Sequence, residues 1–199
     1  MSEYLAKKIV NKMIINNVVD DKNTDAYQYA VQLLIEKCIG FILIYIFALV
    51  AGKTVETSLF LITYLTIRRY SGGYHCKTDI GCLFLSLIYV VVSVCFEIPF
   101  LINHRISADI IFASSIVFML IAGPINHPNM NWSKDEYIAI KKRFFLVVLV
   151  WLVIITCVEL IDVPKNIIIY LYVGVINASF LMMISKILKQ EVKQYDEKI

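Results

Sequence analysis

Six apolar stretches separated by short polar segments dominate the chain from residue 38 onward. The last four are long enough to cross a bilayer, because about 20 helical residues span about 30 Å of hydrocarbon. The first two are shorter and meet at Gly52, so they predict either a thin transmembrane hairpin or a re-entrant pair. The six stretches cover residues 38–52, 54–67, 82–102, 107–123, 144–161 and 167–185.

Residues 1–37 are more polar, and their apolar side chains recur at helical spacing. This pattern is typical of an amphipathic helix lying on a membrane surface, although packing on the protein's own loops explains it equally well. A second helix is expected to begin near residues 23–25, whose side chains can cap it, and to run toward Lys37. The apolar face of the first helix consists of Leu5, Ile9, Val10, Met13 and Ile14.

Composition excludes a soluble class for this chain of 199 residues. It is 59% hydrophobic and 18% charged, whereas soluble domains average about 45–50% and about 25%. The net charge of +3, with dispersed bases, argues against a nucleic-acid partner. We therefore expect an all-α, polytopic bundle of about six transmembrane helices in one domain over residues 1–199. Its parts would be the N-terminal helices (1–37), the membrane spans (38–188) and a tail (189–199).

The basic residues predict an orientation in the cell membrane. With six spans, sixteen of the 19 Lys and Arg residues fall on the side that holds both termini. Only Lys53, Arg105 and Lys165 fall on the other side. Because cytoplasmic loops are enriched in Lys and Arg, both termini and the loop after residue 67 are expected to face the cytoplasm.

Two carboxylates interrupt the apolar stretches. Glu97 is expected to be buried and hydrogen-bonded, and Pro99 two residues later predicts a kinked helix. A functional role for Glu97, for instance in a small transporter, is the alternative. Glu159 lies near the outer end of its stretch and is expected to reach toward the interface.

The loop between the second and third stretches carries the candidate chemistry, since residues 68–82 hold His75, Cys76 and Cys82. A thiol nucleophile needs a base within hydrogen-bond reach and surroundings that favour thiolate. Palmitoylation of a juxtamembrane cysteine, as in a lipidated membrane scaffold, is a competing explanation. A metal site is disfavoured because a fourth ligand is missing, and we expect no cofactor. Five cysteines without a CxxC pair also argue against a disulfide framework.

Cys82 is the better nucleophile candidate on position. If Thr78 or Asp79 caps the third membrane helix, Cys82 falls at about the third helical position, where free N–H groups and the helix dipole favour a thiolate. Cys76 directly follows His75, and adjacent side chains point in different directions. His127 in the other cytoplasmic loop competes with His75 as the base.

The run from Arg68 to His75, followed by Cys82, resembles the signature of the accessory gene regulator B (AgrB) family. The chain length, the multi-span layout and the Pro/Asn-containing loop at residues 122–128 resemble that family too. Cys76 stands where the family more usually has alanine, and His127 where lysine is common.

The resemblance implies a membrane cysteine endopeptidase of a quorum-sensing system. Cys82 would attack the bond before the acidic tail of an AgrD-like precursor peptide, and His75 would accept its proton. The thioester would then be resolved by ring closure to a thiolactone or lactone. The family also implies contact with membrane lipids and a homodimer. The residues expected to contact substrate are Arg68, Arg69, Gly72, Gly73 and Lys77.

Overall fold

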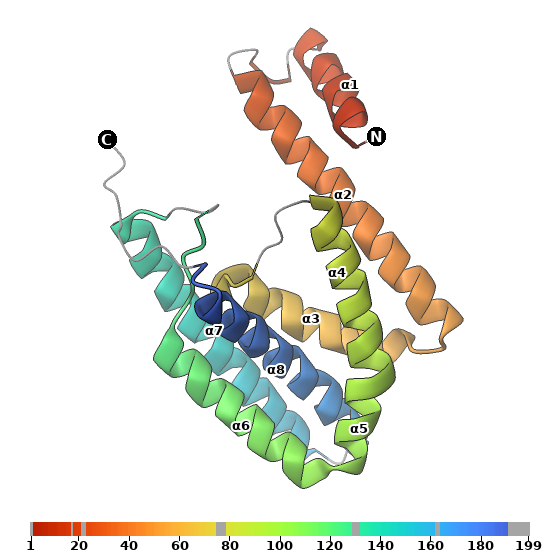
Figure 1. The fold of residues 1–199 in the computed structure, drawn as a ribbon, viewed down its shortest axis with the longest axis vertical. Helices are drawn as coiled ribbons and strands as arrows, with labels where there is room; N and C mark the ends of the chain where they lie inside the picture. Colours follow the sequence, from red (N-terminus) through yellow and green to blue (C-terminus); the bar gives the residue numbers. More distant parts are fainter. Residues whose placement is uncertain are drawn as a thin grey trace. The chain divides into compact units, whose positions relative to one another are not determined.

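Every regular element in the part of the chain that we describe is a helix, as the sequence predicts (Figure 1). The computed structural model describes residues 2–16, 18–20, 23–74, 79–128, 132–161 and 164–190. The chain divides into two units. The first comprises Met1–Gly52 and Cys76–Val90, and the second Lys53–His75 and Val91–Ile199.

The first unit is built on one long helix, α2 (Thr24–Val50), which begins at the predicted position, although Asn23 at its N-cap makes no side-chain cap hydrogen bond. The chain continues from residue 24 to residue 50 as a single helix, so the expected break near residue 37 is wrong. Gly40 is the one glycine between residues 24 and 50, and no proline interrupts the run. The polar first turns and the apolar remainder are therefore one continuous element.

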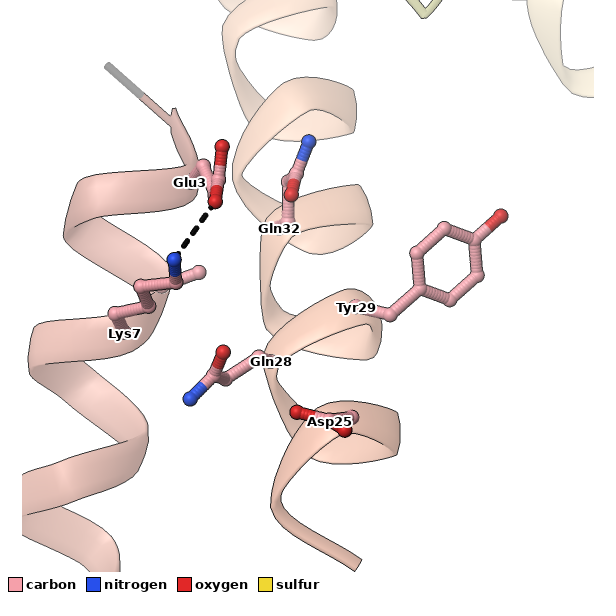
Figure 2. A pocket seen from close by; sticks show the side chains of 7 residues that line it. Glu3, Lys7, Asp25, Gln28, Tyr29 and Gln32 are labelled. Atoms are coloured by element: carbon pink, nitrogen blue, oxygen red, sulfur yellow. Dashed lines mark ion pairs between the residues drawn. The ribbon is translucent and has the colours of Figure 1, made fainter.

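Helix α1 (Ser2–Ile15) lies beside the N-terminal half of α2 (Figure 1). Ala6 and Val10 are buried, whereas Leu5 and Ile9 on the expected apolar face stay exposed. Packing on the protein's own helix therefore accounts for part of the amphipathic pattern. A shallow polar hollow lies between the two helices, where Lys7 pairs with Glu3 at 2.8 Å (Figure 2).

The second unit is a helical bundle centred on α8 (Lys165–Ile187), which packs on α3 (Thr54–Ser71), α6 (Arg105–Ala122) and α7 (Lys134–Leu160) (Figure 1). In the most apolar 18-residue stretch of α8, 67% of the residues are buried, whereas the share is 28% or less in the other long apolar helices. Helix α8 is therefore the core of this unit rather than a lipid-facing span.

Gly174 allows α8 to lie directly on α3. A Cβ atom at Gly174 would sit 2.6 Å from Cβ of Thr63 and 2.9 Å from the backbone nitrogen of Tyr64. Small residues at such crossings let helix backbones approach within a membrane. The α3–α8 contact therefore depends on the absence of a side chain at this position.

Five described helical segments are long and apolar enough to cross a membrane, which makes the chain a multi-pass membrane protein. Helix α3 is not among them, because Glu56, Arg68 and Arg69 interrupt its apolar character. Helix α7 begins ten residues before the expected start, because Ser133 and Glu136 form a capping box ahead of its polar first turns. The five segments are Thr24–Val50, Gly81–Asn103, Arg105–Ala122, Lys134–Leu160 and Lys165–Ile187.

The irregularity expected at Pro99 takes the form of a π-helical turn. Helix α4 (Asp79–Val92) continues through this turn, Ser93–Glu97, into α5 (Ile98–Asn103). Proline lacks an N–H and clashes with the carbonyl four residues earlier, so the preceding turn must widen. The backbone N–H of Ile98 correspondingly donates to the carbonyl of Ser93, five residues back.

Candidate active site

Cys82 lies in the first turn of α4, in the first unit. The helix begins at Asp79, which makes Cys82 its fourth residue rather than the expected third. The residue is half-buried, and its backbone carbonyl accepts a 2.8 Å hydrogen bond from Ser86 Oγ. The backbone N–H groups of a first helical turn have no partner within the helix and carry the positive end of its dipole. This position favours the thiolate form of a cysteine.

In the second unit, α3 ends in a glycine turn that only glycine fits. Gly72 and Gly73 have φ angles of +64° and +120°, in the region that side chains disfavour. A Cβ at Gly72 would overlap the backbone carbonyl oxygen of Ile125, and the N–H of Ile125 donates to the carbonyl of Ser71 at 2.8 Å. The turn is thereby held against the loop that follows α6.

The two arginines at the end of α3 have different environments. Arg68 turns inward, and its Nη2 donates to the backbone carbonyl of Tyr74 at 2.6 Å. The N–H of Tyr74 donates in turn to the carbonyl of Leu181 in α8, at 3.2 Å. Arg69 is exposed, with its guanidinium 5.7 Å from the centre of the Tyr70 ring. The two neighbouring guanidinium groups therefore differ in exposure and in hydrogen bonding.

The loop after α6 is fixed by its own polar contacts. Asn126 is buried and bridges to Trp132, accepting from its N–H at 3.0 Å and donating to its carbonyl at 3.3 Å. Lys186 of α8 donates to the carbonyl of Ala122 at 3.3 Å. Ile125 in the same loop is fully buried. These contacts join the ends of α3, α6 and α8 within one unit.

His127 lies in this loop and is 6% exposed. Burial lowers the pKa of its imidazole, and the positive charge of Arg68 lowers it further, while a hydrogen bond with Gln190 partly opposes both. His127 is therefore neutral at pH 7. Whether His127 competes with His75 as the base stays a prediction.

Acidification should destabilise the protein through His127. A histidine with a lowered native pKa protonates first in the unfolded state, so stability is full above about pH 6.5 and falls as the pH drops toward the native pKa. The loss is about 1.4 kcal/mol for each unit by which the pKa is lowered. Thermal unfolding of the detergent-solubilised protein between pH 5 and pH 7.5 measures it.

Two asparagine variants separate this effect from general acid sensitivity. We expect His127→Asn to lose less Tm on acidification than the parent protein, and His104→Asn, at an exposed position, to lose as much as the parent. An unchanged acid response in His127→Asn would contradict the assignment.

Sequence comparison decides the family. A sequence model described as Accessory gene regulator B matches residues 2–187. The chain belongs to the AgrB family. The chain is 29% identical to AgrB-like protein 2 of Clostridium perfringens (strain 13) over 124 residues, which cover 60% of this chain and 56% of that protein. It is 26% identical to an AgrB-like protein of Listeria monocytogenes (serotype 4a) over 121 residues, 61% of this chain and 56% of that protein.

The chain thus aligns with about half the length of the curated AgrB-like relatives that it matches. No solved structure matches the protein. Family membership confirms the resemblance drawn from the residues, because the matched region contains the whole stretch from Arg68 to Cys82.

Of the AgrB-like motif, the structure describes Arg68, Arg69, the two glycines and Cys82, while His75, Cys76, Lys77 and Thr78 lie outside the described residues. The pairing of Cys82 with a histidine therefore stays a prediction, as does substrate contact by the arginines and glycines. Sequence reasoning missed two residues. Leu181 of α8 accepts a hydrogen bond from Tyr74, and Gln190, just beyond the end of α8, forms a hydrogen bond with His127. Nothing in their local sequence indicates these long-range contacts.

The two carboxylates within the apolar stretches both have polar partners. Asn177 of α8 donates to Glu97 at 3.0 Å and to Ser93 at 2.8 Å, which confirms the expected hydrogen-bonded environment of Glu97. Glu159 is exposed, and specific partners hold its carboxylate. It forms an ion pair with Arg105 at 2.8 Å and accepts from Tyr172 Oη at 2.6 Å. Its partners come from α6 and α8, far away in sequence.

Proposed function

We propose that this AgrB family member is a membrane cysteine endopeptidase that processes a short quorum-sensing precursor peptide. Cys82 is the nucleophile and His75 the general base. The observation that carries the proposal is the family match across the segment that holds both residues. The position of Cys82 in the first turn of α4 supports it, because a thiolate is favoured there.

The chemistry proceeds in two transfers of one acyl group. The Cys82 thiol gives its proton to His75, and its sulfur attacks the carbonyl carbon that joins the central segment to the acidic tail. The C–N bond breaks, the imidazolium protonates the departing amine, and a thioester remains on Cys82. A cysteine thiol or serine hydroxyl of the precursor then gives its proton to His75, which is neutral again, and attacks the thioester carbon. This closes a thiolactone or lactone ring and expels the Cys82 thiolate, which takes the proton back from His75.

A thioester keeps the acyl group activated, so ring closure needs little further driving force. Water would compete for the same carbon and must be excluded. A site at the membrane boundary meets this need and lets an amphipathic leader lie on the lipid surface nearby. Arg69 and Lys77 are the cations that we assign to the acidic tail, and they would act mainly by electrostatic steering. The homodimer stays a prediction.

Processing of a precursor by the chain reconstituted in liposomes tests the proposal against a transporter. The substrate is a synthetic AgrD-like precursor with a central Cys or Ser and an acidic tail. We expect His75→Ala to abolish release of the tail, measured by mass spectrometry, while Glu97→Gln retains it. Glu97 bonds only to Ser93 and Asn177 among the contacts that we describe, so it has no part in the proposed chemistry.

The opposite pattern would refute the peptidase. If His75→Ala leaves release of the tail intact and Glu97→Gln abolishes it, the chain is better described as a transporter. Acylation of Cys76 or Cys82 in resting protein, found by mass spectrometry with no loss of output in the Cys82→Ala variant, would favour a lipidated scaffold.

A further inference from the structure

The guanidinium of Arg68 donates a hydrogen bond to the protein's own backbone. Its Nη2 donates to the carbonyl of Tyr74 at 2.6 Å, six residues along the chain and directly before His75. Tyr74 is also held by α8, because its backbone N–H donates to the carbonyl of Leu181 at 3.2 Å. Tyr74 is thus held between the end of α3 and the core helix of the unit.

The glycine at position 73 leaves space for the guanidinium. A Cβ atom there would overlap Nη1 of Arg68, and the backbone already has a φ of +120° that side chains disfavour. Nη1 is buried and has no hydrogen-bond partner within the part of the chain described. A substituent at residue 73 would therefore displace the arginine from Tyr74.

No carboxylate among the described residues lies within ion-pair distance of Arg68. Burying a cation without a counter-ion costs free energy, which an ordinary helix-end arginine avoids by reaching into water, as Arg69 does. Arg68 is instead half-buried, with its Nη1 buried, and makes one short, charge-assisted hydrogen bond to a carbonyl. What this hydrogen bond achieves is to hold the carbonyl of Tyr74, the residue directly before His75 in the sequence.

We propose that Arg68 is a positioning residue, which acts through the Tyr74 carbonyl to fix the chain leading into His75 and does not bind substrate. This revises the expectation that Arg68 and Gly73 contact the substrate. It rests on the proposed function, because the residue being positioned is the assigned base. Arg69, exposed on the next position, remains the arginine available to the peptide.

Reactivity of the Cys82 thiol without any peptide distinguishes positioning from substrate binding. The full-length protein in liposomes is treated with iodoacetamide between pH 5 and pH 10, and modification of Cys82 is followed by mass spectrometry. Trypsin cleaves after Lys77, so Cys82 and Cys76 fall on different peptides. A base that pairs with the thiol lowers the midpoint of this profile below the value of about 8.5 for a free cysteine.

We expect Arg68→Gln to raise the midpoint toward that of His75→Ala, and Arg69→Gln, which removes the same charge, to leave it unchanged. In peptide processing, Arg68→Gln should lower kcat about tenfold or more with little change in KM. An unchanged midpoint together with a raised KM would overturn the proposal and make Arg68 a substrate contact. If His75→Ala itself leaves the midpoint at the parent value, the assigned base is wrong, which is a separate failure.

Gly73→Ala disrupts the same hydrogen bond between Arg68 and Tyr74 without changing Arg68, and it serves as the second variant in case Arg68→Gln does not fold. Its Cβ displaces the guanidinium, so the midpoint should rise as in Arg68→Gln. The double variant should be no worse than the more affected single one, because both remove one interaction. Additive effects of the two substitutions, or a parent-like midpoint in a folded Gly73→Ala protein, would contradict the positioning role.

Discussion

Replacing Cys82 with alanine should abolish cleavage of the precursor, lowering the rate by about 10⁴-fold or more. The variant has no sulfur at residue 82 to form the acyl intermediate. Neither His75 nor the amphipathic leader of the precursor can replace that sulfur. Tail release from a synthetic precursor in proteoliposomes measures the loss. Cys82 is half-buried on the surface of one helix turn, so its removal should leave Tm unchanged.

Cys76→Ala is the matched control, since it removes a second thiol from the same loop. It should cleave at the parent rate, because the proposed chemistry uses only the thiol of Cys82, in the first turn of α4. An inactive Cys76→Ala protein beside an active Cys82→Ala protein would transfer the nucleophile to Cys76 while leaving the family assignment intact.

Adding a single methyl group at Gly174 should destabilise the second unit by about 1–3 kcal/mol. The new Cβ would lie 2.6 Å from Cβ of Thr63 and 3.0 Å from the carbonyl oxygen of Phe60, so α3 and α8 must move apart. Both neighbours belong to the rigid α3 helix, which cannot yield as a flexible side chain does. A fall in Tm of the detergent-solubilised protein on the order of 10 °C would follow.

Gly40→Ala serves as the control for this prediction. It is also a helical glycine in an apolar segment, but its new Cβ would meet only the end of the Leu83 side chain, at 3.0 Å. Alanine also favours the helix over glycine by about 0.5–1 kcal/mol, so Tm should stay constant or rise. Equal losses in the two variants would show that the α3–α8 contact is not as close as described.

The apolar stretches could be predicted from the sequence because lipid requires long runs of apolar residues, but the helix boundaries could not. Helices α2 and α7 extend well into polar sequence, where hydropathy carries no signal. In α7 the extension follows the capping box of Ser133 and Glu136, a local signal that could have been used. The continuity of α2 had no such marker and required only that nothing break the helix.

The candidate site could be predicted only where its chemistry is local. The segment from Arg68 to Cys82 contains its thiols, imidazole, cations and glycines within 15 residues, so the sequence could name it as a candidate, and the pairing of Cys82 with His75 stays a prediction. The turn that Arg68 bonds at Tyr74 is also held by Leu181 of α8 and by Ile125 in the loop after α6, which bond the backbone of Tyr74 and Ser71. Such contacts are fixed by tertiary structure, and no periodicity in a single sequence indicates them.

Trapping the acyl-enzyme tests the central claim most directly. The reconstituted protein is incubated with a precursor whose ring-closing cysteine or serine is replaced by alanine, so that the acyl group cannot leave by cyclisation. After tryptic digestion, we predict a peptide-sized adduct on residue 82 of the 78–105 fragment, lost on treatment with hydroxylamine. An adduct on Cys76, or tail release with no adduct on any cysteine, would contradict the account.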